Sequence, residues 1–219
     1  MLEIVYDDAH IAVCVKPVGT AAQGEVPGAM PQLLRAQLGC EAVFPVHRLD
    51  QIVGGVMVYA KTQPAAAALS RQVQAGELQK EYLAVLRGAP QRQADTLCDL
   101  LYHDRTKNKT FVVTRKRAGA REARLAYTLV QRVPDGAGWL SLVRVQLFTG
   151  RTHQIRAQFA SRKLPLLGDG KYGGGDNRCA CALWSYRLRF SHPISGAEMT
   201  FTRLPPDSLP WNLFLMEGL

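Results

Sequence analysis

The sequence lacks a hydrophobic run long enough to cross a membrane. Its longest uncharged apolar stretch, residues 52–60, is far shorter than the roughly 20 residues that a membrane-spanning helix needs. The first eight residues, MLEIVYDD, are acidic where a secretion signal would be basic. We therefore expect neither a membrane anchor nor a signal peptide, and a protein that works in the cytoplasm.

The sequence also lacks the cysteine spacings that bind metals. None of the five cysteines has C-x-x-C spacing, and the pair Cys179-Ala-Cys181 stands alone. This pattern favours reduced, mostly buried thiols in a cytoplasmic protein. We expect no bound metal.

Three common catalytic motifs are missing as well. The chain contains no GxxxxGK[ST], HExxH or GxSxG segment, and its GxGxxG match at residues 168–173 does not lie between a predicted strand and a predicted helix, as a dinucleotide-binding site requires. Interpretations as a phosphate-loop ATPase, a dinucleotide-binding enzyme, a zinc peptidase or a serine hydrolase therefore have no support. No repeat, low-complexity tract or linker divides the chain, which favours one domain.

Acidic residues are scarce relative to basic ones. Among 219 residues, 27 are Lys or Arg and 18 are Asp or Glu, so the net charge is +9 and the pI is near 9.6. Such an excess is typical of nucleic-acid binders, although basic proteins also bind membranes and acidic partners. Eight of the basic residues lie between Arg105 and Arg124, beside only one acidic residue, Glu122. This segment is either a solvated face of exposed strands or a patch that neutralises phosphates.

Short apolar runs bounded by glycine and proline indicate many strands and few helices. Strands are predicted over residues 11–15, 53–60, 80–86, 110–114, 125–132, 139–147, 188–190 and 199–201. Helices are predicted over residues 32–38, 62–75 and 152–161, with Thr62 as an N-cap and Gly76 as a stop. The alternation in the strand 139–147 slips near residues 142–143. The irregular order predicts an α+β fold with a mixed sheet.

The segment His47-Arg48-Leu49-Asp50 places a carboxylate where a loop enters a buried strand. Burying a carboxylate is costly unless it is paired, and so Asp50 needs a partner. Neighbouring side chains of an extended segment point in opposite directions. Spacing alone leaves two interpretations open, a surface ion pair and a catalytic carboxylate.

Two further segments place basic or aromatic side chains on predicted elements. Arg151 and Arg156 bracket a predicted helix start, where backbone N–H groups favour anions. An ordinary amphipathic helix start explains the same pattern. The segment Lys80–Val85 is an amphipathic strand, in which Tyr82 is either a core aromatic or a side chain that stacks on a base.

Five short motifs stand in order along the chain. They are Lys16-Pro-Val-Gly19, His47-Arg-Leu-Asp50 with its strand to Ala60-Lys61, Lys80-Glu-Tyr-Leu-Ala84, Gly150-Arg-Thr-His-Gln-Ile-Arg156 and Gly168-Asp-Gly-Lys-Tyr-Gly173. Together they resemble the RluA-type family of RNA pseudouridine synthases. The resemblance extends from Lys16 to about Asp207, and five motifs in register form a specific signal.

The resemblance implies an architecture and an activity. It implies one catalytic domain over residues 1–219, with a central mixed, mostly antiparallel sheet split by an active-site cleft. No separate N-terminal RNA-binding module is expected. The implied enzyme is an isomerase that converts uridine to pseudouridine in structured RNA, tRNA or rRNA, without a cofactor or a metal. We expect it to act as a monomer.

The resemblance also implies a role for individual residues. Asp50 corresponds to the catalytic aspartate, Tyr82 to the aromatic residue at the target base and Arg156 to the basic partner of the aspartate. Arg48 corresponds to the arginine that fills the space left by the extruded nucleotide. We expect further RNA contacts from His47, Lys80, Arg151, His153, Arg115, Lys116 and Arg117.

The chain departs from the family pattern at two places. Val53-Gly54-Gly55 stands where the family usually has Thr-Ser-Gly, which removes two hydroxyls near Asp50, and Trp184-Ser185 stands where His-Ala is more common. The first departure leaves a second interpretation open, a non-catalytic protein that binds or folds RNA on the same scaffold. A third, a nucleoside or glycan hydrolase, usually needs two carboxylates, and Asp169 is expected to be structural.

Overall fold

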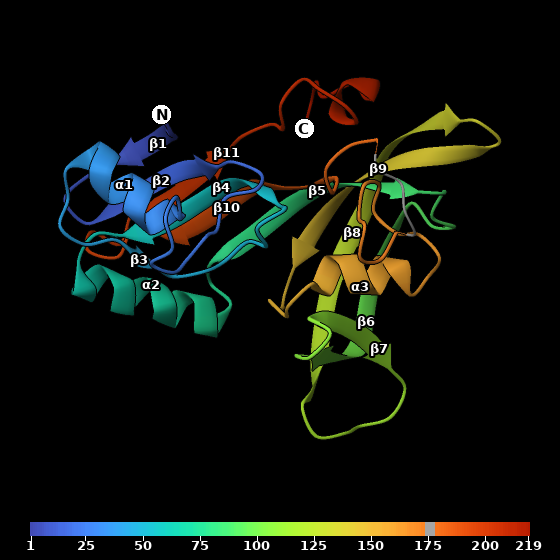
Figure 1. Ribbon diagram of the computed structural model, residues 1–219, viewed down its shortest axis with the longest axis horizontal. Coiled ribbons are helices and arrows are strands. Elements are labelled where there is room, and N and C mark those ends of the chain that lie inside the picture. The colour runs from blue at the N-terminus through green and yellow to red at the C-terminus, as the bar shows by residue number, and fades with distance from the viewer. Residues whose placement is uncertain (174–177) are drawn as a thin grey trace. The chain divides into compact units, whose positions relative to one another are not determined.

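The computed structural model describes residues 1–173 and 178–219 (Figure 1). The chain forms two compact units, each of which contains segments that are distant in sequence. The first unit comprises Met1–Lys80 and Trp184–Pro205, and the second comprises Glu81–Leu183 and Pro206–Leu219. Strands dominate both units, and a few helices cover them. The predicted α+β class with a mixed, mostly antiparallel sheet is confirmed.

The first unit is built on a sheet whose inner strands are buried on both faces. The strand order is β1 (Glu3–Asp7), β2 (Ile11–Lys16), β4 (Gly54–Ala60), β10 (Leu183–Ser191) and β11 (Glu198–Thr202), and the short β3 (Phe44–Pro45) also pairs with β4. All of these pairs are antiparallel except β4 with β10. In that parallel pair, Trp184 lies beside Gly54 and Ser185 beside Gly55.

Helix α2 (Gln63–Ala75) packs on one face of this sheet (Figure 1). Its buried residues Ala65 and Leu69 join a cluster with apolar side chains of β2, β4 and β10. The predicted caps are confirmed, because the Thr62 side chain accepts a hydrogen bond from the backbone N–H of Ala65 and Gly76 ends the helix with a left-handed φ of 75°. The shorter helix α1 (Met30–Leu38) begins two residues before the predicted position.

The described residues of the second unit form five strands. Their order is β5 (Gln79–Arg87), β9 (Gly138–Leu147), β8 (Ala120–Asp135), β6 (Ala94–Asp104) and β7 (Lys109–Val113). The predicted slip near residues 142–143 corresponds to a register shift, since Leu129 pairs with Val143 whereas Gln131 pairs with Leu142. The extra residue, Val130, belongs to β8.

Helix α3 (Gln154–Ala160) is buried along most of its length. The ring of Phe159 meets that of Tyr127 from β8 at a centroid distance of 5.5 Å. The short 3₁₀ helix η1 (Trp211–Leu213) also belongs to this unit. Among the described residues, no helix combines the length and apolar character needed to cross a membrane.

The structure differs from the predicted elements in further ways. It adds β1, β3, β6 and η1, extends β8 well beyond residues 125–132 and β10 well beyond residues 188–190, and begins α3 two residues later than predicted. None of the five cysteines forms a disulfide within the described ranges. The expectation of mostly buried thiols is only partly right, since Cys14 and Cys181 are buried and Cys98 is exposed.

Candidate active site

Asp50 lies in a tight turn that leads into β4 of the first unit. The backbone N–H of Val53 donates to the carbonyl of Asp50 at 2.9 Å and closes the turn. Gln51, at the tip, makes two reciprocal bonds with Gly19, because the Gly19 N–H donates to the Gln51 carbonyl and the Gln51 side chain donates to the Gly19 carbonyl, each at 2.8 Å. The turn is therefore held against the Lys16–Gly19 loop.

Lys16 ties the same two loops together from inside the protein. Its side chain is fully buried, and its Nζ donates to the carbonyls of Pro17, Thr20 and Gln51 at 2.9, 2.7 and 3.2 Å. Burial lowers the pKa of Lys16 to about 8, and the carboxylate of Asp50 opposes this shift. The buried ammonium of Lys16 and the candidate carboxylate therefore interact electrostatically.

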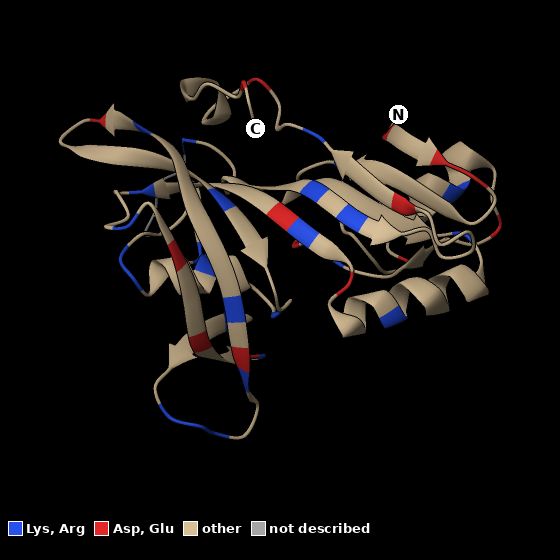
Figure 2. Cartoon of the chain, turned by 180° about the vertical axis from the view of Figure 1, so that it is seen from behind, with Lys and Arg blue, Asp and Glu red and all other residues tan. Residues whose placement is uncertain are grey.

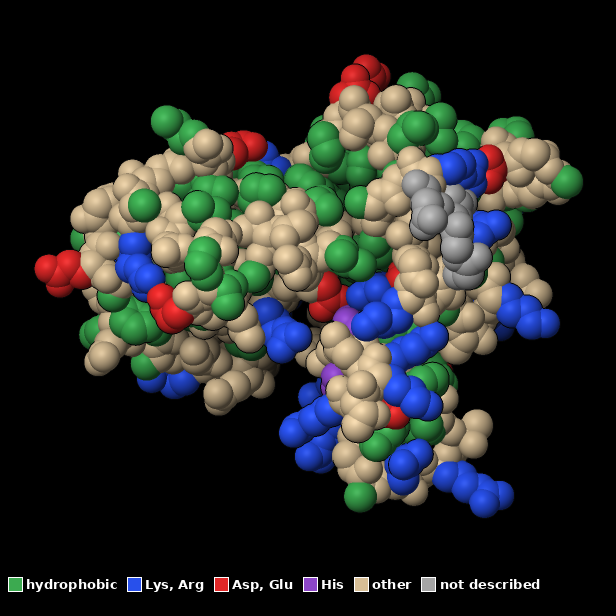
Figure 3. All heavy atoms as spheres, in the orientation of Figure 1, with side chains coloured by type: hydrophobic (Ala, Val, Ile, Leu, Met, Phe, Trp, Pro, Cys, Tyr) green, Lys and Arg blue, Asp and Glu red, His purple; other side chains and the backbone are tan. Residues whose placement is uncertain are grey.

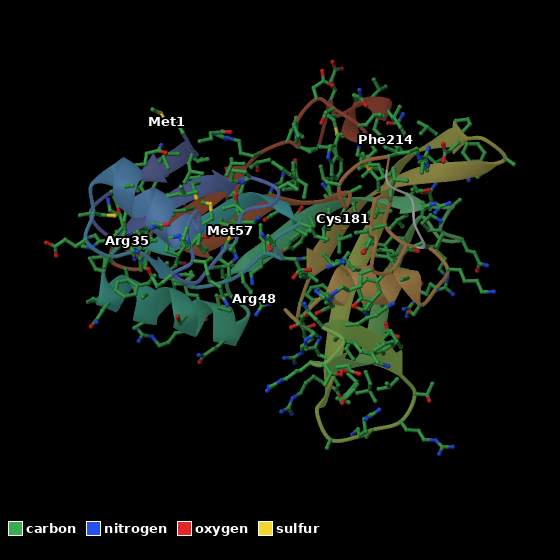
Figure 4. All side chains as sticks on the ribbon, in the orientation of Figure 1. Met1, Arg35, Arg48, Met57, Cys181 and Phe214 are labelled. Carbon is green, nitrogen blue, oxygen red and sulfur yellow. The ribbon has the colours of Figure 1, made fainter. Side chains whose placement is uncertain are left out.

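The side chains of the His47–Asp50 segment alternate between the interior and the solvent. Arg48 is exposed (Figure 4), Leu49 is buried and Asp50 is half-buried. His47 is buried, and its Nε2 accepts the backbone N–H of Val58 at 3.2 Å. Burial lowers the pKa of His47 to about 3, and the nearby charge of Lys80 adds to the shift. This neutral, buried state favours a structural role for His47 over the predicted contact with RNA.

Two glycines open β4 directly after the turn. Gly55 has φ +120°, and a Cβ atom there would overlap the backbone of Ser185. A Cβ atom on Gly54 would lie 2.5 Å from Cζ3 of Trp184. The predicted departure from a Thr-Ser-Gly sequence therefore coincides with a site where the neighbouring strand leaves no room for a side chain.

Tyr82 lies on β5 in the second unit, where only 5% of its surface is exposed. The preceding residue, Glu81, has its Oε2 atom 3.9 Å from Nε of Arg144 on β9.

Lys80 belongs to the first unit and is half-buried, and burial lowers its pKa. Such a partly desolvated ammonium binds an anion more strongly than a fully hydrated one.

Arg156 on α3 forms a buried bidentate ion pair with Asp169. Its Nε and Nη2 donate to the two carboxylate oxygens at 2.7 and 2.8 Å, and both side chains are at most 4% exposed. Asp169 also accepts the backbone N–H groups of Lys171 and Tyr172. This agrees with a structural role for Asp169, which orients the guanidinium that was predicted to serve the site.

Tyr172 connects this ion pair to the start of α3. Its ring lies 5.1 Å from the Arg156 guanidinium, and its hydroxyl accepts the backbone N–H of Thr110 at 2.7 Å. The same hydroxyl lies 3.1 Å from Nδ1 of His153. His153 has a left-handed φ of 53°, a strained conformation that tends to occur at functional sites.

The basic segment of the sequence forms a projecting structure, which we call the basic finger (residues 100–124 of β6, β7 and β8 with their loops). Lys and Arg residues mark it in Figure 2, and their side chains gather over it in the space-filling view of Figure 3. Arg115, Lys116 and Arg117 are exposed in the loop between β7 and β8, and the Arg117 guanidinium lies 3.9 Å from the ring centre of Tyr102. Arg151 is also exposed, with its Nε bound to the Glu122 carbonyl.

Sequence reasoning missed what two of these side chains do. The sequence pattern places Lys16 only in a loop motif, although a lysine that directly follows the fully apolar run 11–15 is a candidate for burial. The partner of Asp169 was not identified, and no local signal would have found it, because Arg156 is 13 residues away. Asp50 belongs to the first unit and Tyr82 and Arg156 to the second.

Comparison with known proteins assigns the family. A family model described as RNA pseudouridylate synthase matches residues 10–161. The dual-specificity RNA pseudouridine synthase RluA of Escherichia coli (strain K12) is 33% identical over 218 residues, which cover 94% of each chain. The ribosomal large subunit pseudouridine synthase D of Xanthomonas campestris pv. campestris is 32% identical over 95% of this chain and 67% of its own.

A solved structure has the same fold. Human RNA Pseudouridylate Synthase Domain Containing 1 superposes with a TM-score of 0.81 at 22% identity, over 96% of this chain and 85% of that one. The match of the family model extends over more than half of the chain, and RluA-type relatives match nearly all of it. The chain therefore belongs to the RNA pseudouridylate synthase family, as an RluA-type isomerase of uridine in RNA.

Proposed function

We propose that this protein isomerises defined uridines of a structured tRNA or rRNA, with Asp50 as the catalytic carboxylate. The observation that carries the proposal is the Asp50 turn, which four hydrogen bonds involving Lys16, Gly19, Gln51 and Val53 hold in place. The name of one relative, a ribosomal large subunit synthase, supports rRNA as a substrate, and the name of another, a dual-specificity RNA synthase, supports action on more than one RNA target.

The reaction needs a carboxylate of this kind. The C1′–N1 bond of uridine breaks, the base turns over, and a new C1′–C5 bond forms while the proton at C5 passes to N1. The carboxylate serves either as a nucleophile at the sugar or base, or as a base that permits elimination. Because hydrogen bonds hold the turn in place, the carboxylate keeps its position while the C1′–N1 bond breaks and while the C1′–C5 bond forms.

Tyr82 and Arg156 complete the proposed catalytic set. Tyr82 stacks on the uracil, which is worth roughly 1–3 kcal/mol in single-stranded binders, and its hydroxyl relays the proton from C5. Arg156 supplies the positive charge that orients the carboxylate of Asp50 for the reaction. The ion pair with Asp169 supports this role because it restricts the guanidinium to one orientation.

The remaining basic residues are assigned to the RNA. Extruding a nucleotide costs a few kcal/mol, which phosphate contacts offset. Arg48 fills the vacated space, and the other proposed contacts come from Lys80, Arg151, His153, Arg115, Lys116 and Arg117. We further propose that residues 1–219 act as the catalytic domain, as a monomer in the cytoplasm, without a cofactor or a metal.

The decisive experiment compares the wild type with Asp50→Asn on bulk tRNA and rRNA that lack the modification. RNA labelled with tritium at C5 of uridine releases the label when the wild type acts on it. Asp50→Asn is expected to release none, while its RNA affinity changes by less than about threefold, because the shape of the turn is kept. Glu77→Gln, the same chemical change at an exposed carboxylate, should leave turnover unchanged.

Substantial turnover by Asp50→Asn would refute the catalytic assignment. The rival interpretation, an RNA-binding or RNA-folding protein without catalysis, is not favoured, because the family match and the relatives are synthases. It would gain support if the wild type bound structured RNA in a salt-dependent way and made no pseudouridine in any cellular RNA.

A further inference from the structure

Gly54 and Trp184 lie side by side on the parallel strands β4 and β10. A Cβ atom on Gly54 would be 2.5 Å from Cζ3 of Trp184 and 3.1 Å from Cγ2 of Val18. Real Cβ atoms do not approach a neighbour as closely as the first of these distances. Any side chain at position 54 therefore requires the indole ring to move.

The ring is poorly placed to move. Trp184 is 7% exposed, and its Nε1–H donates to the carbonyl of Arg203 at 2.9 Å. The next residue, Ser185, is fully buried and donates from its hydroxyl to the carbonyl of Val56. Two hydrogen bonds thus fix this part of β10 against β4 and its neighbours. The indole ring fills the space next to Gly54 and has little freedom to shift.

The ring lies against the residue that directly follows the turn that carries Asp50. Gly54 follows Val53, whose N–H closes the turn on the Asp50 carbonyl. Val18, the other side chain near Gly54, belongs to the loop that binds Gln51 through Gly19. The ring and Val18 therefore both lie next to Gly54, where the Asp50 turn joins the sheet. We expect a change in either side chain to displace the start of β4.

We propose that Trp184 is a positioning residue for Asp50 and that residues 54 and 184 exclude each other sterically. The indole occupies the space that a side chain at position 54 would need. In this way it fixes the position of the turn relative to the sheet, and therefore the direction of the Asp50 carboxylate. The proposal rests on the proposed catalytic role of Asp50. It also gives one explanation for the two departures from the family pattern, at Gly54 and at Trp184. The small residue on β4 makes room for the large residue on the neighbouring strand β10.

The test is a double-mutant cycle with Gly54→Ser, Trp184→Ala and the variant that carries both. Thermal unfolding is measured first, and then RNA affinity and the single-turnover rate at saturating RNA, well below the lowest Tm. Each single change is expected to slow the single-turnover rate by about tenfold or more, with RNA affinity within about threefold of the wild type. A purely structural role would leave that rate unchanged in the folded protein.

The double variant is expected to be coupled. Independent effects would multiply to a loss of about a hundredfold, whereas the serine in the double variant occupies space that the indole has left, so the loss stays near tenfold. Its Tm should likewise exceed the value expected from adding the two single shifts. Trp184→Phe, which keeps a ring, should retain a rate within about threefold of the wild type. Trp139→Ala, at a 41% exposed tryptophan, is the matched control and should be neutral.

Two results would overturn the proposal: multiplicative rates with additive Tm shifts, or a full single-turnover rate in Trp184→Ala. The failure of the proposed function is distinguishable from both. If the wild type makes no pseudouridine, or if Asp50→Asn remains active, the positioning role falls with the catalytic one. The steric exclusion between positions 54 and 184 is still decided by the Tm values alone.

Discussion

The guanidinium of Arg156 donates two hydrogen bonds to the carboxylate of Asp169, and both side chains are buried. Breaking a buried pair leaves one charge uncompensated, which typically costs about 3–5 kcal/mol. Asp169→Asn should therefore lower the free energy of unfolding by about that amount in urea titrations. The exposed pair Arg189–Glu198 is the control, and Glu198→Gln should change stability by less than about 1 kcal/mol. A loss at Asp169 no larger than at Glu198 would contradict the structural role.

The lowered pKa of Lys16 predicts that its contribution to the stability of the fold increases with pH in the alkaline range. Its pKa is about 8 in the fold against an ordinary value of 10.5, so between these values the unfolded chain binds more protons than the folded one. The cost of burying the charge is fully present below pH 8 and is relieved as the pH rises toward 10.5. The contribution of Lys16 to stability therefore rises with pH, by about 3 kcal/mol in total.

Comparison with Lys16→Met isolates this contribution, because the other titrating groups are common to both proteins. Urea titrations between pH 7.5 and 10.5 should show the wild type gaining stability relative to the variant. Parallel stability curves for the two proteins would show that Lys16 has an ordinary pKa.

The basic finger predicts a change in the salt dependence of RNA binding. Replacing Arg115, Lys116 and Arg117 together by alanine should weaken binding. It should also reduce the slope of log affinity against log salt by about 0.7–0.9 for each phosphate that these side chains neutralise in the wild type. The single-turnover rate at saturating RNA should not change. Arg71→Ala, at an exposed arginine of α2, should leave the slope as it is, and an equal effect there would argue against a specific role of the finger.

Tyr172→Phe should loosen the link between the finger and α3. The change removes the hydroxyl that accepts the Thr110 N–H and contacts His153, and an amide left without its acceptor costs about 1–3 kcal/mol. Hydrogen exchange at the Thr110 amide should accelerate accordingly. Tyr127→Phe, which removes a longer hydrogen bond of 3.4 Å to the Arg92 carbonyl, should leave that amide unchanged. Unaltered exchange in Tyr172→Phe would contradict the assignment.

The sequence predicted those elements whose residues carry their own signal. The caps Thr62 and Gly76 bound α2 as expected, and the slip near residue 142 was visible because apolar residues change phase there. β6 was missed because its sequence, ADTLCDLLYHD, has few strand formers. It is a strand because β7 and β8 bind its two edges.

The same distinction applies to the site. Asp50, Tyr82 and Arg156 were found as motif members, and their catalytic roles remain proposals. The burial of His47, the burial of Lys16 and the ion pair of Asp169 depend on residues that are distant in sequence, such as Val58, Gln51 and Arg156. The clash that explains Gly54 involves a residue 130 positions later, and no local pattern reports it.

The division of each unit between separate stretches of chain has a consequence during synthesis. When the ribosome has released residues 1–80, β4 still lacks β10, because Trp184–Pro205 has not been made. At about 5–20 residues per second, the intervening hundred residues take about 5–20 seconds. Until β10 has been made, the edge of β4 at Gly54 and Gly55 has neither its partner strand nor the Trp184 indole beside it. The nascent chain therefore presents an open strand edge that a chaperone or a premature neighbour can occupy before Trp184 arrives.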